Sequence, residues 1–137
     1  AASKGVSNKV DWSMLQPAIS VEHQEADETS LLTLYRHFGY ARSVNSALAN
    51  GYPEADSADD CGGKLAGWYL HSLTDDKVVL VLHNLSGAPI STKRWAGENA
   101  TNESILVRNG KVTVSGSVAD GTSVTLPGYS SVVFALN

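Results

Sequence analysis

The sequence has little of what several classes of protein need. Its 137 residues include a single cysteine, so no disulfide can form within the chain. No apolar run approaches the roughly 20 residues of a membrane-spanning helix. The 10 basic residues are scattered among 14 acidic ones, for a formal net charge of −4. A nucleic-acid-binding surface is therefore excluded, because it needs clustered positive charge to neutralise phosphates.

Reactive and metal-binding patterns are equally scarce. Cys61 stands among acidic neighbours that should raise its thiol pKa, which argues against a nucleophile. The Gly-x-Ser-x-Gly motif of serine hydrolases is missing. His71 and His83 end neighbouring predicted strands and could approach each other, but two ligands are thin evidence for zinc. The acidic, glycine-rich stretch Glu54–Lys64 does not have EF-hand spacing and is interpreted as a mobile, solvated loop. We predict no metal and no cofactor.

What is present is a globular composition, with 42% apolar and 18% charged residues. The most informative stretch is Lys77–Asn84, a short apolar run between turn signals. Alternate side chains of a strand point to opposite faces. Both faces of this run are apolar, so it is predicted to be a central strand that is covered on both sides.

The N-terminal part contains one clear helix signal. Ala1–Gln24 has no sustained period and is predicted to be an irregular lead-in. Asp27–Asn45 is predicted to be a helix, with capping side chains at its start and large apolar residues at helical spacing. The apolar face consists of Leu31, Leu34, Tyr35 and Phe38.

From Leu65 onward the pattern changes to period two and predicts seven short strands. Asn109-Gly110 is a hairpin signal of type I′ between two of them. Lys93-Arg94 is interpreted as a solvated strand edge or loop. The expected fold is mainly β: an antiparallel Greek-key β-sandwich with one N-terminal α-helix. The predicted strands are Leu65–His71, Lys77–Asn84, Ile90–Trp95, Ser104–Arg108, Lys111–Ser115, Ser123–Leu126 and Ser131–Leu136.

Four motifs in order resemble the C-terminal end of an α-amylase of glycoside hydrolase family 13. Ser20–Leu32 resembles the start of that family's last barrel helix, and Tyr35–Leu48 continues its pattern. Val79–Ser86 resembles an early strand of the C-terminal domain, and Leu126–Val133 resembles its closing strand. The sequence departs from the pattern at several positions, among them Gly39, where a larger apolar residue is usual.

The resemblance implies a piece of a larger enzyme. Residues 1–50 are expected to be the lead-in and the remnant of the last barrel helix, and residues 51–137 the C-terminal β-sandwich domain. Members of the family use two carboxylates about 5–5.5 Å apart at the ends of barrel strands. This chain is expected to begin after those strands, so no catalytic residue is assigned. The implied function is a non-catalytic accessory domain of a starch or α-glucan hydrolase that stabilises the missing barrel.

Several partners follow from this interpretation. The catalytic barrel of the same parent chain is the first, α-glucan is a second, and self-association through the helix face is a third. The helix face is expected to be covered by the sandwich, by the lead-in or by another copy, because exposing large apolar side chains is costly. A polymeric substrate implies a secreted, periplasmic or cell-surface setting.

Two other classes of function remain open at this level. The chain could be an independent carbohydrate-binding module, or an unrelated adhesion or scaffold domain of the immunoglobulin or fibronectin type. A sugar ring stacks on aromatic side chains, for which Trp95 and Trp68 are the main candidates. Trp95 ends a predicted strand just before Ala96-Gly97, a predicted loop, and is the best surface candidate. Trp68 and Tyr69 must point to opposite faces of one strand, so that one of them joins the core. Tyr52 and Tyr129 are further aromatic candidates.

Overall fold

The computed structural model describes residues 21–27 and 29–137. The chain divides into two compact units, residues 1–36 and residues 37–137. The lead-in expected for residues 1–20 lies outside the described residues, and the predicted domain boundary after residue 50 stays a prediction. The helices are α1 (Val21–Ala26), α2 (Leu31–Val44) and α3 (Ser46–Asn50), and the strands are β1 (Tyr52–Ala55), β2 (Leu65–His71), β3 (Val78–Asn84), β4 (Ile90–Lys93), β5 (Ile105–Asn109), β6 (Thr113–Ser117), β7 (Gly121–Leu126) and β8 (Ser131–Ala135).

Polar side chains set the limits of the helices. The Ser30 hydroxyl accepts a hydrogen bond from the backbone N–H of Thr33 at the start of α2. The Asn45 side chain accepts from the backbone N–H of Ala47 and caps α3. The prediction of a helix in this region is confirmed by α2. Helical structure already begins at Val21, where an irregular lead-in was expected, so that part of the prediction is wrong.

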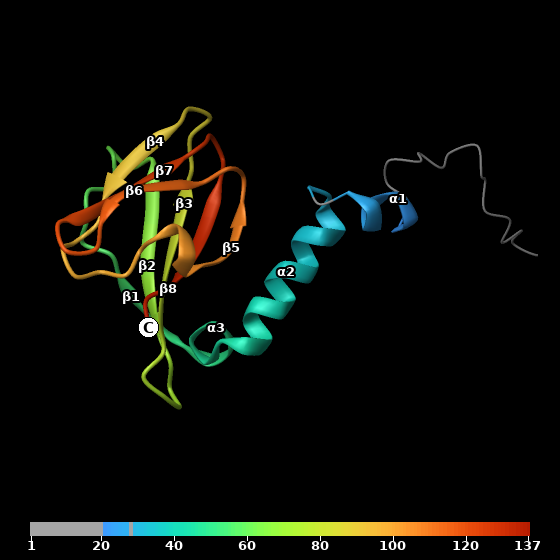
Figure 1. The fold of residues 1–137 in the computed structure, drawn as a ribbon, viewed down its shortest axis with the longest axis horizontal. Helices are drawn as coiled ribbons and strands as arrows, with labels where there is room; N and C mark the ends of the chain where they lie inside the picture. The colour runs from blue at the N-terminus through green and yellow to red at the C-terminus, as the bar shows by residue number, and fades with distance from the viewer. Residues whose placement is uncertain (1–20, 28) are drawn as a thin grey trace, which may run out of the picture. The chain divides into compact units, whose positions relative to one another are not determined.

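The β-sandwich consists of two antiparallel sheets (Figure 1). The five-stranded sheet has the order β1-β2-β3-β8-β5, and the three-stranded sheet has the order β4-β7-β6. Strands that are neighbours in space are often far apart in sequence, as in β3 beside β8. The predicted fold class is confirmed.

The apolar residues form two layers on either side of the five-stranded sheet. Leu80 and Leu82 of β3 point between the sheets, where Phe134 is completely buried. Val79 and Val81 point to the outer face, where they pack with Ala41 of α2 and with α3. The prediction that β3 is covered on both faces is therefore confirmed. Because both faces of such a strand are buried, its sequence is an almost continuous apolar run.

Two local predictions are wrong. β1 includes Glu54 and Ala55, which fall in the stretch Glu54–Lys64 that was predicted to be a loop. β1 forms an exposed edge strand paired with β2, which is a position that tolerates proline. The second error concerns Asn109-Gly110, which connects β5 of one sheet with β6 of the other and makes no hairpin. Gly110 has a positive φ but Asn109 does not, and a type I′ turn needs both.

Candidate functional site

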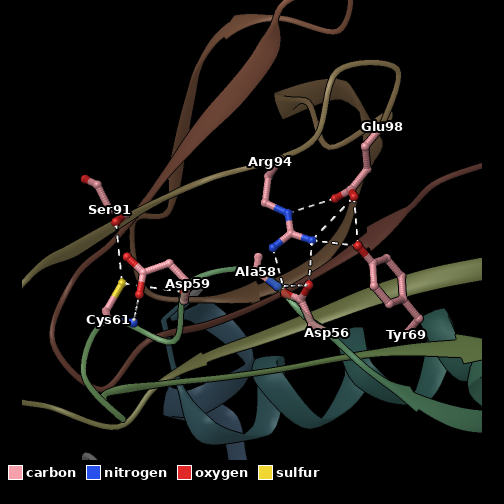
Figure 2. A network of polar contacts seen from close by, with 8 residues as sticks. All are labelled: Asp56, Ala58, Asp59, Cys61, Tyr69, Ser91, Arg94 and Glu98. Atoms are coloured by element: carbon pink, nitrogen blue, oxygen red, sulfur yellow. Dashed lines mark hydrogen bonds and ion pairs between the residues drawn. The ribbon is translucent and has the colours of Figure 1, made fainter.

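A buried arginine is the most distinctive chemical feature of the β-sandwich. Arg94 directly follows β4, and its side chain is 0% exposed. Its Nη1 lies 2.7 Å from Asp56 Oδ2 and its Nη2 lies 3.2 Å from Asp56 Oδ1, so the pair is bidentate. Its Nε donates to Glu98 Oε1 at 2.8 Å. Tyr69 completes the cluster, which we call the Arg94 network (Figure 2).

Tyr69 links the two sides of this network. Its hydroxyl accepts a hydrogen bond from Arg94 Nη2 at 2.7 Å and donates one to Glu98 Oε2 at 2.8 Å. The side chains of Asp56 and Glu98 are only 4% and 8% exposed. Burial lowers the pKa of Arg94, but its hydrogen bonds to the two carboxylates outweigh burial and raise that pKa above the ordinary value. The guanidinium therefore remains charged and its donors are matched by acceptors.

Gly67 leaves space for the Asp56 carboxylate of this network because it has no side chain. Gly67 faces Leu82 in the β2–β3 register. A methyl group at Gly67 would lie 2.8 Å from Asp56 Oδ2 and 3.0 Å from Leu82 Cδ2. An isolated glycine in a strand often marks such a close approach. The expectation of a solvated Lys93-Arg94 pair is therefore wrong for Arg94, because Asp56 and Glu98 compensate its charge in the interior.

The network also corrects the prediction of a mobile, solvated loop at Glu54–Lys64. Glu54 belongs to β1, and Asp56 is buried against Arg94. Asp59 accepts from the backbone N–H of Cys61 at 2.9 Å, and Asp60 accepts from that of Gly62. The carboxylates of Asp59 and Asp60 therefore stabilise the turn that contains Cys61 and Gly62. Burial, followed by the charges of Asp59 and Asp60, raises the pKa of Cys61, as its sequence context indicated.

The chemistry of the network is that of a structural element. Glycoside hydrolysis needs two carboxylates that flank a sugar and can act as nucleophile, acid or base. Asp56 and Glu98 are instead both bound to one guanidinium in the interior. We therefore assign the network to the positioning of the loop that follows Arg94.

Titration of Tyr69 provides a test of the network. Burial, followed by the hydrogen bond to Glu98, raises the pKa of Tyr69 from 10.0 to about 12. Between these values the unfolded chain has released the proton that the folded chain retains. The contribution of Tyr69 to stability is thus complete below pH 10 and is lost as pH rises through about 12. The free energy of unfolding, measured in urea, should fall more steeply in this window for the wild type than for Tyr69→Phe. Equal slopes would disprove the assignment.

The two tryptophans occupy different environments. Trp95 is 54% exposed, and its carbonyl accepts the backbone N–H of Glu98. Trp68 is half-buried in the outer apolar layer, with its ring centroid 5.0 Å from that of His83. Trp68 and Tyr69 point to opposite faces, as predicted. The structure does not bring Trp68 and Trp95 into one site, and sugar binding by either remains a prediction.

The two histidines that could approach each other do not. His71 faces Val78 at one end of the β2–β3 pair, whereas His83 faces Ala66 at the other end. His71 Nε2 contacts Glu54 Oε2 at 2.5 Å, and its ring stacks on Tyr52. Burial lowers the pKa of His83, whose Nδ1 lies 2.5 Å from the Ser131 hydroxyl oxygen.

The predicted apolar helix face is largely open. Leu31, Tyr35 and Phe38 lie on one side of α2 and are 62%, 69% and 38% exposed. The only α2 residue that is buried is Ala41. Across residues 21–27 and 29–137, none of the helices is both long and apolar enough to cross a membrane.

Comparison with known proteins identifies the sandwich. Residues 70–133 match the family model of the α-amylase SusG C-terminal domain. The chain is 30% identical to the α-amylase SusG of Bacteroides thetaiotaomicron over 141 aligned residues, which cover 95% of this chain and 18% of that enzyme. The chain fits the C-terminal region of an α-amylase-family enzyme. The comparisons therefore confirm the resemblance that the four sequence motifs indicated.

Two solved structures of larger enzymes contain a region with a similar fold. An α-amylase from H. orenii superposes with a TM-score of 0.62 at 26% identity, over 86% of this chain and 22% of that one. The trehalulose synthase MutB from Pseudomonas mesoacidophila superposes with a TM-score of 0.66 at 19% identity, over 90% of this chain and 21% of that one, which shows the shared fold. The chain thus spans about a fifth of the length of these proteins.

Proposed function

We propose that this chain is the non-catalytic accessory domain of an α-amylase-like α-glucan hydrolase and stabilises the catalytic barrel of the same parent chain. The observation that carries the proposal is the apolar stripe of α2, formed by Leu31, Tyr35 and Phe38 at helical spacing. Large apolar side chains on one helix face are typical of a surface that packs on another element. In the proposed function that element is the barrel.

The size of the relatives supports this role. The chain aligns with only 18% of SusG and 22% of the H. orenii α-amylase, so most of each relative lies outside the aligned region. Burying a large apolar side chain contributes roughly 1.5–3 kcal/mol. A stripe of three such residues is thus sufficient for the sandwich and the barrel to stabilise each other measurably.

Two tyrosines of α2 form a matched pair for testing this function. Tyr35 lies on the stripe and Tyr40 on the opposite side of the helix, yet they are 69% and 70% exposed in this chain. In the full-length protein, Tyr35→Ser should lower the midpoint of thermal inactivation of starch hydrolysis by a few degrees, because it removes apolar contact with the barrel. Tyr40→Ser should leave the midpoint unchanged. The proposal fails if both variants inactivate at the wild-type temperature.

A further inference from the structure

A groove at the edge of the five-stranded sheet has no assigned role. It has a volume of about 430 Å³. Small-molecule sites are typically roughly 300–1,000 Å³. Its walls come from β1 and β2, from the chain after β4, and from the ends of β3 and β8. The residues used below are Glu54, Tyr69, His71, Glu98 and Asn99.

Strand register explains why this groove exists. Tyr52 faces His71 and Glu54 faces Tyr69, so all four side chains lie on one face of the β1–β2 pair. That face continues into Leu80, which is the register partner of Tyr69 and belongs to the core between the sheets. The second sheet has only three strands. The loop that follows β4 borders the groove instead.

The Arg94 network gives the groove a fixed floor. Tyr69 and Glu98 belong to both, and their side chains are connected by a 2.8 Å hydrogen bond. Arg94 Nε donates a hydrogen bond to Glu98 Oε1 and fixes the position of that side chain. The loop is also held by the backbone N–H of Gly97, which donates to the carbonyl of Val118. A preorganised site loses less free energy to the ordering of its side chains when a ligand binds.

The lining combines flat rings with polar groups. The rings of Tyr52 and His71 are stacked, with centroids 5.2 Å apart and planes inclined by 21°. Tyr52 is 52% exposed and stacks on His71 from outside the lining of the groove. Glu54 and Asn99 are exposed residues of the lining and supply acceptors and an amide for hydroxyl groups.

Charge selects the class of ligand. Arg94 is shared between Asp56 and Glu98, so the three groups together carry a formal charge of −1, and Glu54 adds another negative charge. An anionic ligand would be repelled, whereas the hydroxyl groups of a neutral sugar can donate to the carboxylates. We propose that this groove binds a neutral saccharide, with its ring against His71, which Tyr52 supports by stacking. The choice of an α-glucan as the probe rests on the proposed function.

The test is an NMR titration of the 137-residue, ¹⁵N-labelled chain with maltotetraose. Saturable shifts are expected at the backbone amides of His71, Gly97 and Asn99. Tyr52→Ala should weaken binding about tenfold because it removes the ring that stacks on His71 and supports it in the groove wall. Asn99→Ala, in a loop outside the sheets, should also weaken it. Tyr40→Ala is the control and should bind as the wild type does.

Three outcomes would overturn the proposal. They are the absence of saturable shifts at the groove, shifts confined to Trp95 or Trp68, and equal binding of a tetragalacturonate, which is anionic. Each is independent of the barrel. If maltotetraose did not bind in the groove, the comparison of the Tyr35 and Tyr40 variants would still test the proposed function. If that comparison failed, binding in the groove could still be measured.

Discussion

Replacing Arg94 with methionine should lower the free energy of unfolding by about 3–5 kcal/mol. The substitution fills most of the volume but leaves Asp56 and Glu98 without their guanidinium, although their side chains are only 4% and 8% exposed. Two buried carboxylates without a counter-charge are strongly unfavourable. Urea unfolding of the wild type and the variant at neutral pH provides the comparison.

A triple variant separates the loss of charge balance from the loss of packing. Arg94→Met combined with Asp56→Asn and Glu98→Gln has no uncompensated charge in the network. It should recover most of the stability that the single variant loses, because neutral polar groups cost less to bury than charged ones. A loss below about 1 kcal/mol in the single variant is what an exposed ion pair gives, and would contradict the buried network.

Gly67→Ala should destabilise the sandwich by about 1–3 kcal/mol, as overpacking of an interior does. The new methyl group would lie 2.8 Å from Asp56 Oδ2 and 3.0 Å from Leu82 Cδ2. Arg94 Nη1 donates to the same oxygen, so the carboxylate cannot move away without straining that hydrogen bond. The midpoint and slope of urea unfolding measure the effect.

Gly39→Ala is the matched control for this substitution. Gly39 lies inside α2, and a methyl group there would meet no atom within 4 Å. Alanine is favoured over glycine in a helix by roughly 1 kcal/mol. The same chemical change should therefore stabilise α2 and destabilise the sandwich. A neutral result at Gly67 would mean that Asp56 and Leu82 can move aside, and that the glycine is not needed for the network.

The strands of the sandwich could be predicted because their signal is local. β2 has the predicted limits, and β3 and β8 differ from prediction by one residue at one end. In β3 the apolar residues on both faces identified a central strand before any partner was known. The exposed edge strand β1 gave no such signal, since none of its residues is buried.

The candidate sites could be predicted only in part. Trp95 was correctly placed at the surface. Arg94 was misinterpreted because a Lys-Arg pair after a strand is normally solvated, and Asp56 is 38 residues away in the sequence. Two weak signals existed: Gly67 within an alternating strand, and Glu98 four residues after Arg94. The groove could not be inferred, because it depends on the pairing of β1 with β2.

The most direct measurement of the central claim is thiol labelling of α2 in the full-length protein. Tyr35→Cys and Tyr40→Cys place a thiol on and off the apolar stripe, at positions that are 69% and 70% exposed in this chain. Labelling rates are followed by mass spectrometry of the peptide that contains each position. If α2 docks on the barrel, the thiol at position 35 is protected while the thiol at position 40 reacts quickly. Equal, rapid labelling of both would contradict the account of this region as a domain that stabilises a catalytic barrel.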